Sequence, residues 1–167
     1  RVLDWSIDAA RAGSVGIVLV VSGDRIDEEE PDVDRVVVGG ATRSASVRAG
    51  LEAVPRDAQV VVVHDAARPL AGPDLFDAVV DAIGPGIDGA IPGAAVTDTI
   101  KRIDGNRIVE TLEREELIAV QTPQAFRAGV LRRAHERGGD ATDDAALVEA
   151  LGGIVVVVPG PPGNLKI

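Results

Sequence analysis

The feature that most constrains this chain is an apolar run that ends abruptly in polar residues, VVVHDAARP at residues 61–69. A run of valines without polar alternation is typical of a strand buried on both faces, as in the parallel sheets of α/β enzymes. Ligands of such enzymes bind at the carboxyl ends of the strands. Asp65 would follow the strand, the alanines after it would let a ligand approach the backbone, and Pro69 would stop the strand. The segment therefore predicts an α/β enzyme with a polar site after this strand.

Composition limits the class of protein. The 167 residues are enough for one domain with its own core, and the apolar residues are nearly all aliphatic, with one Trp, two Phe and no Tyr. The absence of cysteine excludes disulfides and thiolate metal sites. A net charge of −10 argues against a nucleic-acid surface, although a local group of basic residues could still hold an anionic small molecule. Because no apolar stretch approaches the length of a membrane span and no secretory leader is visible, we expect no membrane partner and a cytoplasmic protein.

Apolar runs alternate with amphipathic stretches along the chain, without internal repeats. Expected strands lie at residues 16–21, 35–38, 59–64, 89–92, 117–121 and 154–158. Expected helices begin near residues 2, 44, 73, 127 and 142 and end near residues 13, 54, 83, 137 and 151, and Ser44 and Thr142 are the expected N-caps of two of them. Apolar strands separated by helices are typical of parallel sheets covered on both faces. We therefore predict one domain over residues 1–167, a Rossmann-like three-layer sandwich with a mainly parallel sheet.

Residues 100–111 do not fit this scheme. Two short runs of alternating residues flank Asp104-Gly105-Asn106, a turn sequence typical of a β-hairpin. The hairpin should project from the domain as an arm over about residues 95–116. Since projecting hairpins of this kind often hold a second subunit, we expect a homodimer formed through the arm.

Both ends of the sequence are unusual for a doubly wound domain. The chain begins within a helix and finishes where a strand begins, whereas such domains usually start with a strand and a glycine-rich turn. We therefore expect an N-terminal strand with its glycine-rich loop, and a final helix, to lie outside this sequence.

Two segments near the predicted strand ends each admit a functional and a structural explanation. In GGATRSASV at residues 39–47, the paired glycines could let a base or ribose lie on the backbone, or they could form an ordinary turn. Asp65 could hold a sugar hydroxyl or the water shell of a metal while Arg68 holds a phosphate, or the two could simply form a surface ion pair. His64 has no evident partner in the sequence and is better explained as a packed residue at the strand end than as a catalytic base.

Two further segments also carry candidate residues. Thr99 and Arg114 lie on opposite sides of the hairpin and could meet at one site, or they could belong to a solvent-facing arm. Thr142 could donate to a ligand or merely cap a helix. Lys166 leaves a Pro/Gly-rich loop as a compact charge that could lie beside a phosphorus centre.

Taken together and in order, the motifs are far more specific than any one of them: GGATRSASV, HDAARP, DTIKR, QTPQ, TDD and NLK. This series resembles the 2-C-methyl-D-erythritol 4-phosphate cytidylyltransferase family over about residues 39–167, and less specifically before them. The resemblance implies a homodimeric enzyme of the non-mevalonate isoprenoid pathway that transfers a cytidylyl group from CTP to 2-C-methyl-D-erythritol 4-phosphate and releases pyrophosphate. It also implies Mg²⁺ bound mainly through the CTP phosphates, with no metal ligand assigned to the protein.

The resemblance also assigns roles by matching position. Residues that would contact the nucleotide are Gly40, Ser46 and Ala66. Residues that would bind the sugar phosphate are Asp65, Arg68, Thr99 and Thr142. Residues that would be catalytic, by orienting the attacking phosphate, are Arg114 and Lys166, of which Lys166 would also lie near the α-phosphate.

Two departures from the family and two alternatives accompany this hypothesis. Ala41 stands where some relatives have an acid, and the family's N-terminal glycine-rich loop, with its Arg and Lys, has no counterpart here. Cytidylyl transfer to ribitol 5-phosphate uses similar parts, and pyrophosphate release measured with each sugar phosphate would separate the two activities. A non-catalytic nucleotide-binding module is the alternative from another class, and the encoded residues upstream of Arg1 would test it.

Overall fold

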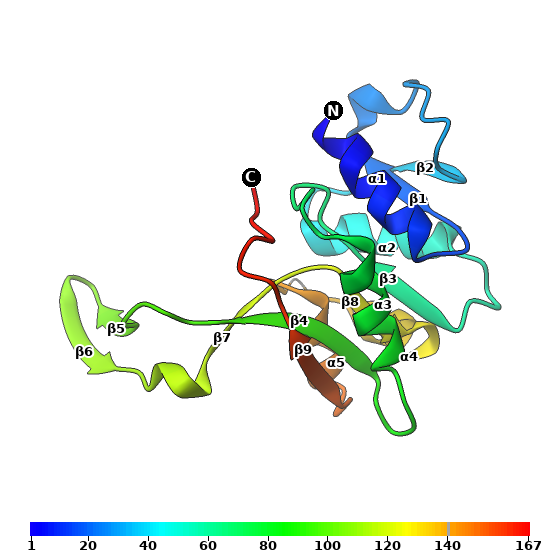
Figure 1. Cartoon of the computed structure of the whole chain (residues 1–167). Coiled ribbons are helices and arrows are strands. Elements are labelled where there is room, and N and C mark those ends of the chain that lie inside the picture. Colours follow the sequence, from blue (N-terminus) through cyan, green and yellow to red (C-terminus); the bar gives the residue numbers. More distant parts are fainter. Residues whose placement is uncertain (140) are drawn as a thin grey trace.

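The computed structural model describes residues 1–139 and 141–167 (Figure 1). Its helices are α1 (Val2–Ala12), η1 (Gly23–Arg25), α2 (Arg43–Ala53), α3 (Pro73–Asp81), η2 (Arg114–Glu116), α4 (Ala128–Glu136) and α5 (Asp144–Glu149). Its strands are β1 (Val18–Val21), β2 (Arg35–Val38), β3 (Val60–Val63), β4 (Gly89–Ala95), β5 (Lys101–Asp104), β6 (Arg107–Thr111), β7 (Ile118–Val120), β8 (Gln124–Arg127) and β9 (Val155–Pro159). Within the described part, no helix is long and apolar enough to cross a lipid bilayer.

The strands confirm the α/β class, but the predicted parallel pairing holds only in part. Strands β1 and β2 form a parallel pair, and β9 runs parallel to β4. The five-stranded sheet, with the order β3-β8-β4-β7 and β9 also on β4, is otherwise antiparallel. The cause is β8, which the sequence pattern did not predict. Strand β8 lies between β3 and β4 and runs antiparallel to both, and β7, three residues earlier in the chain, also pairs antiparallel with β4, at residues 93–95.

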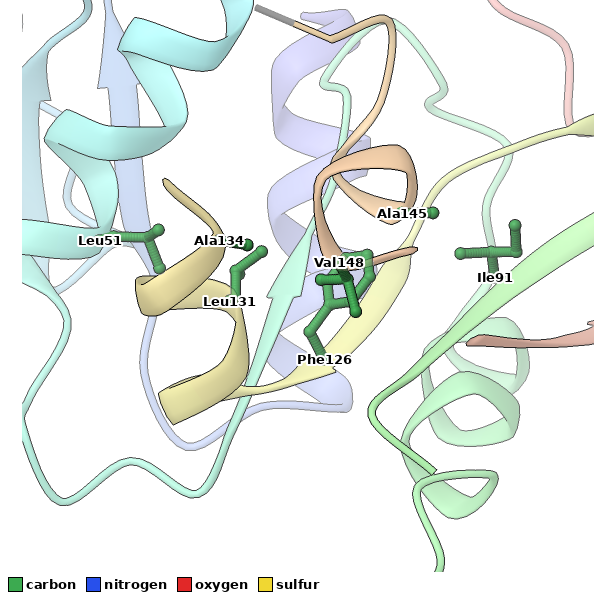
Figure 2. Packing of buried hydrophobic residues seen from close by; sticks show 7 residues of the cluster. All are labelled: Leu51, Ile91, Phe126, Leu131, Ala134, Ala145 and Val148. Carbon is green, nitrogen blue, oxygen red and sulfur yellow. The ribbon is translucent and has the colours of Figure 1, made fainter. Parts of the chain in front are cut away.

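Alternating residues of β4 and β8 build the three predicted layers. Ile91 and Phe126 pack with residues of α2, α4 and α5 on one side of the sheet (Figure 2). Their neighbours Ala90 and Ala125 pack on the other side against Val79 of α3. Because successive side chains of a strand point to opposite faces, this alternation places helices on both faces of the sheet. The three-layer sandwich is therefore confirmed, with the fully buried Phe126 at the centre of one layer.

Strands β5 and β6 form a hairpin that projects far from the rest of the molecule, as predicted (Figure 1). Gly105 has a φ of +54° at the tip, a left-handed conformation that favours glycine. All residues of both strands are exposed, among them Ile103 and Ile108, which face one another across the hairpin. The hairpin thus has no core of its own.

The two predicted helix caps are wrong by one or two residues. Helix α2 is capped by Thr42, whose Oγ1 accepts a hydrogen bond from the Ala45 N–H, whereas Ser44 is buried inside the helix. Helix α5 is capped by Asp143, whose carboxylate accepts from the N–H of Ala146, and not by Thr142. An ionised carboxylate is favoured over a hydroxyl at a helix N-terminus because it also meets the positive end of the helix dipole.

Candidate functional site

The loop after β3 and the end of the chain meet side by side. The Ile167 N–H donates to the carbonyl of Ala67 at 2.9 Å, which aligns the two backbones. Lys166 Nζ lies 2.6 Å from Asp65 Oδ2, although the two residues are 101 positions apart. The apolar strand and the Pro/Gly-rich loop identified in the sequence therefore deliver a carboxylate and an ammonium group to one place.

Two more charged residues extend this contact into the protein. Arg43, the first residue of α2, lies with its Nε 3.6 Å from Asp65 Oδ1 and its Nη2 2.9 Å from Asp144 Oδ2. Asp144, the first residue of α5, is fully buried. We call Asp65, Lys166, Arg43 and Asp144 the charged cluster. Its two acidic and two basic side chains alternate in space, so each charge has a neighbour of opposite sign.

The charged cluster keeps Asp65 ionised. Burial alone would raise the pKa of the Asp65 carboxyl, but the hydrogen bond and charge of Lys166, with the charge of Arg43, lower that pKa below its ordinary value. The neighbouring His64 is different, since burial lowers its pKa to about 4 and its ring packs against Phe76 with the centroids 5.1 Å apart. His64 is therefore neutral at pH 7, and its interpretation as a packed strand-end residue is confirmed.

The Arg68 guanidinium donates hydrogen bonds to backbone carbonyls and forms no ion pair with an acidic side chain of the described residues. Its Nη1 donates to the carbonyl of Asn164 at 2.7 Å, and its Nη2 lies 3.4 Å from the carbonyl of Val120. Asp65 forms its ion pairs with Lys166 and Arg43, so of the two explanations offered above, a surface ion pair between Asp65 and Arg68 is not observed. The guanidinium thus supplies a donor to two carbonyls that would otherwise lack one.

Asn164 fixes the backbone just before Lys166. Its buried Nδ2 donates to Gln121 Oε1 at 3.0 Å and to the carbonyl of Thr122 at 2.9 Å. The Gln121 side chain in turn donates to the carbonyl of Pro161. Lys166 thus projects from a segment that side chains of the QTPQ motif anchor to the body of the protein.

The predicted nucleotide residues Gly40 and Ser46 also lie together. The Gly40 N–H donates to Ser46 Oγ at 3.2 Å, in the turn that joins β2 to α2. A Cβ atom at Gly40 would come within 2.4 Å of the Cβ of Ala45, so this turn requires glycine. The same turn leads into Arg43 and so adjoins the charged cluster. Ala66 is exposed in the loop after β3, next to Asp65.

The remaining predicted residues fall in two places. Thr142 is exposed and lies two residues before Asp144, a member of the charged cluster. Thr99 and Arg114 lie at the base of the arm, where Arg114 Nη1 donates to the carbonyl of Thr97 at 2.8 Å. Within the described residues, the Arg114 side chain forms its hydrogen bonds and ion pair with Thr97 and Glu115, and none joins it to the charged cluster.

Sequence analysis overlooked residues that the structure places at the centre. Arg43 and Asp144 both stand in motifs quoted above, GGATRSASV and TDD, but neither received a role. Asn164 stands in the motif NLK in the same way. The motifs could therefore have identified these residues as candidates. Their roles could not be predicted, because they depend on contacts between segments that lie far apart in the chain.

Comparisons with known proteins agree on one family. A family model described as IspD: 2-C-methyl-D-erythritol 4-phosphate cytidylyltransferase matches residues 1–167. The bifunctional enzyme IspD/IspF of Solidesulfovibrio magneticus is 50% identical over 132 residues, which are 77% of this chain and 33% of that protein. The 2-C-methyl-D-erythritol 4-phosphate cytidylyltransferase of Streptomyces coelicolor is 46% identical over 140 residues, 79% of this chain and 52% of that protein. The chain thus spans about a third to a half of the length of these curated relatives.

Solved structures support the same assignment. The crystal structure of 2-C-methyl-D-erythritol 4-phosphate cytidylyltransferase from Thermus thermophilus superposes with a TM-score of 0.88 at 34% sequence identity. The match covers 99% of this chain and 82% of that one. The family model likewise includes every segment that contributes to the charged cluster and to the arm. The chain therefore belongs to the 2-C-methyl-D-erythritol 4-phosphate cytidylyltransferase family.

Proposed function

We propose that this chain transfers the cytidylyl group of CTP to 2-C-methyl-D-erythritol 4-phosphate, in the non-mevalonate isoprenoid pathway. Family membership supports the reaction, and the observation that carries the site is the 2.6 Å contact between Lys166 Nζ and Asp65 Oδ2. That contact puts a partly exposed ammonium group at the carboxyl end of a strand, where α/β folds bind their ligands.

The reaction needs positioning and charge neutralisation more than covalent catalysis. A phosphate oxygen of the sugar phosphate attacks the α-phosphorus of CTP, a new P–O bond forms, and the bond to the β-phosphate bridge breaks to release pyrophosphate. Lys166 would leave Asp65 to neutralise charge on the reacting phosphates. Asp65 would then accept a hydrogen bond from a hydroxyl group of the substrate, and Arg68 would act by holding the segment that carries Lys166.

The nucleotide would bind beside this cluster. Gly40 and Ser46 would present backbone and hydroxyl groups to the base and ribose, and Ala66 would offer backbone near the ribose. The hydrogen bond between Gly40 and Ser46 supports a shared role, since it shapes one turn from both residues. Thr142 would contact the chain of the sugar phosphate from the start of α5.

Mg²⁺ would enter with the triphosphate. Among the described residues, no group of three or more His, Cys, Asp or Glu side chains gathers in a way that could hold a metal ion. Mg²⁺ does not require such a group, because it usually keeps several waters and is held by substrate phosphates and one or two carboxylates. Asp65, the partly exposed carboxylate of the charged cluster, is the residue that would hold it. When bound, the ion would neutralise charge on the triphosphate oxygens.

The arm would complete the site of a second subunit in a homodimer. Its exposed apolar side chains Ile103, Ile108 and Val109 support this proposal, because a free hairpin gains nothing from displaying them. Thr99 and Arg114 would then reach the partner's sugar phosphate. A cytoplasmic location is part of the same proposal.

Pyrophosphate release tests the function. Purified protein is incubated with CTP, Mg²⁺ and either 2-C-methyl-D-erythritol 4-phosphate or ribitol 5-phosphate. We expect release with the first substrate to be the faster. Faster release with ribitol 5-phosphate would contradict the substrate, and CTP binding without release from either would contradict the enzyme.

A further inference from the structure

A buried acid and a buried histidine lie directly behind the charged cluster. Asp144 Oδ1 is 2.8 Å from His135 Nε2, and the side chains are 0% and 3% exposed. The proposed reaction uses neither residue. Removing a carboxylate from water is costly unless both of its oxygens find partners. Here the second oxygen, Oδ2, lies 2.9 Å from Arg43 Nη2 in an ion pair, although it accepts no hydrogen bond within the described residues, so Arg43 supplies the charge that offsets the burial of this acid.

The contacts continue outward to the surface in a definite order. Arg43 is 29% exposed and Asp65 19% exposed, and Lys166 at the outer end is 55% exposed. From His135 to Lys166, five side chains from five separate segments form one row of contacts at 2.8, 2.9, 3.6 and 2.6 Å. A change at the inner end of this row can therefore reach the ammonium group without any direct contact.

Arg43 is the residue through which such a change would pass. Its Nη2 is engaged by Asp144, while its Nε faces Asp65 at 3.6 Å, which is an ion-pair distance rather than a hydrogen bond. As long as His135 occupies Oδ1, Asp144 offers Arg43 a single oxygen. Without His135, both oxygens could engage the guanidinium in the bidentate geometry that arginine favours, and Arg43 would be drawn away from Asp65.

We propose that His135 and Asp144 are positioning residues, which hold Arg43 against Asp65 and so set how Asp65 holds Lys166. The proposal rests on the function proposed above for its kinetic consequence. Its structural content does not, because the position of Lys166 can be followed in the absence of substrate.

The chain is well suited to that measurement, since Lys101 and Lys166 are its two lysines. Lys101 lies on the hairpin, where its Nζ donates a hydrogen bond to Thr111 Oγ1. Its signal therefore serves as an internal control for changes that do not involve the charged cluster. Protein labelled with ¹³C-lysine gives two side-chain signals by NMR, and Lys101→Arg assigns them. His135→Leu removes the partner of Asp144, His135→Gln restores an amide donor, and Leu131→Val is a matched core change one turn earlier on α4.

We expect His135→Leu to shift the Lys166 signal and leave that of Lys101 in place. His135→Gln should return Lys166 toward its original position, and Leu131→Val should move neither signal. With CTP and the sugar phosphate, His135→Leu should lower kcat/KM by about 2- to 30-fold, with recovery in His135→Gln.

A folded His135→Leu protein with an unchanged Lys166 signal would overturn the proposal, as would equal shifts of both lysines. Should His135→Leu fail to fold, Asp144→Asn provides the same readout, and an unmoved Lys166 there would also overturn it. If the wild-type protein shows no cytidylyl transfer, the proposed function fails while the NMR result still decides the positioning role.

Discussion

The charged cluster and the arm both carry paired acidic and basic side chains, but those of the cluster are partly buried and those of the arm are exposed to solvent. In the cluster, Lys166 and Asp65 are backed by buried groups and by backbone hydrogen bonds from other segments. In the arm, Arg102 and Glu110 pair at 3.0 Å with 64% and 47% of their side chains exposed, and Arg114 is half exposed. An exposed pair is screened by water and salt and contributes little. The fold of one chain thus positions the charged cluster, whereas it gives the side chains of the arm little support.

The largest expected effect tests whether the charged cluster and the arm of one site belong to different subunits. Lys166→Ala and Arg114→Ala should each lower turnover by about 10²- to 10³-fold, because in the proposed reaction each side chain neutralises charge on the reacting phosphates. Circular dichroism should show both variants folded. If the arm serves the partner's site, mixed dimers of the two variants contain one intact site each, and an equal mixture should recover about a quarter of wild-type activity. A mixture no more active than its components would place Arg114 outside the partner's site.

The next largest effect is a pH dependence of the unfolding free energy, which we expect from buried His64 in the body of the protein and not from the exposed arm. Because the pKa of folded His64 is about 4, the unfolded chain takes up a proton at a higher pH than the native protein does. Stability from neutral His64 is present at pH 7 and is lost as the pH falls from about 6.5 to 4, by about 2 to 3 kcal/mol. Urea unfolding of wild-type protein and His64→Gln at about pH 7 and about pH 4.5 measures the difference. Equal pH dependence of the two proteins would contradict it.

A somewhat smaller effect is expected at the anchor of Lys166. Asn164→Ala removes two buried hydrogen bonds and leaves Gln121 Oε1 without its donor, which should cost about 1 to 3 kcal/mol of unfolding free energy. Turnover should fall as well, since the segment carrying Lys166 loses its attachment. The neighbouring Leu165→Ala changes an exposed side chain and serves as the control in the same denaturation series. Equal stability of the two variants would show that the anchor is not needed.

The smallest effect on stability is expected in the arm. Ile103→Ser with Ile108→Ser should change the unfolding free energy of the dissociated single chain by no more than about 0.5 kcal/mol, because both side chains are exposed within one chain. Sedimentation velocity should nevertheless show loss of the dimer. The control is Val15→Ser, an exposed apolar change on the body. A dimer that survives the double substitution would remove the hairpin from the interface.

The difference between the two regions also explains how much the sequence could predict. The valine run before Asp65 and the Asp104-Gly105 turn are local signals, and both led to the observed strand and hairpin. Strand β8 was missed because QAFR is short and mixed in character, and its pairing partners lie far away in the chain. With β8 unrecognised, the sheet was expected to be mainly parallel.

The site divides in the same way. Motif order identified the segments that carry Asp65 and Lys166, but no local pattern could show that these side chains touch. The direction of the Arg68 guanidinium depends on where the carbonyl of Asn164 lies, 96 positions away. Arg43 and His135 gain their places from Asp144, whose burial follows from the packing of α5.

The main-chain bond from Ile167 to Ala67 has an evolutionary consequence. An amide proton and a carbonyl oxygen are supplied by almost any amino acid, so this tether survives replacement of the residues that form it. Leu165 and Ile167 are both exposed, and they are free to drift while the residue between them keeps its register. Substitutions at these two positions can thus change the surface around the ammonium group without moving that group away from its carboxylate.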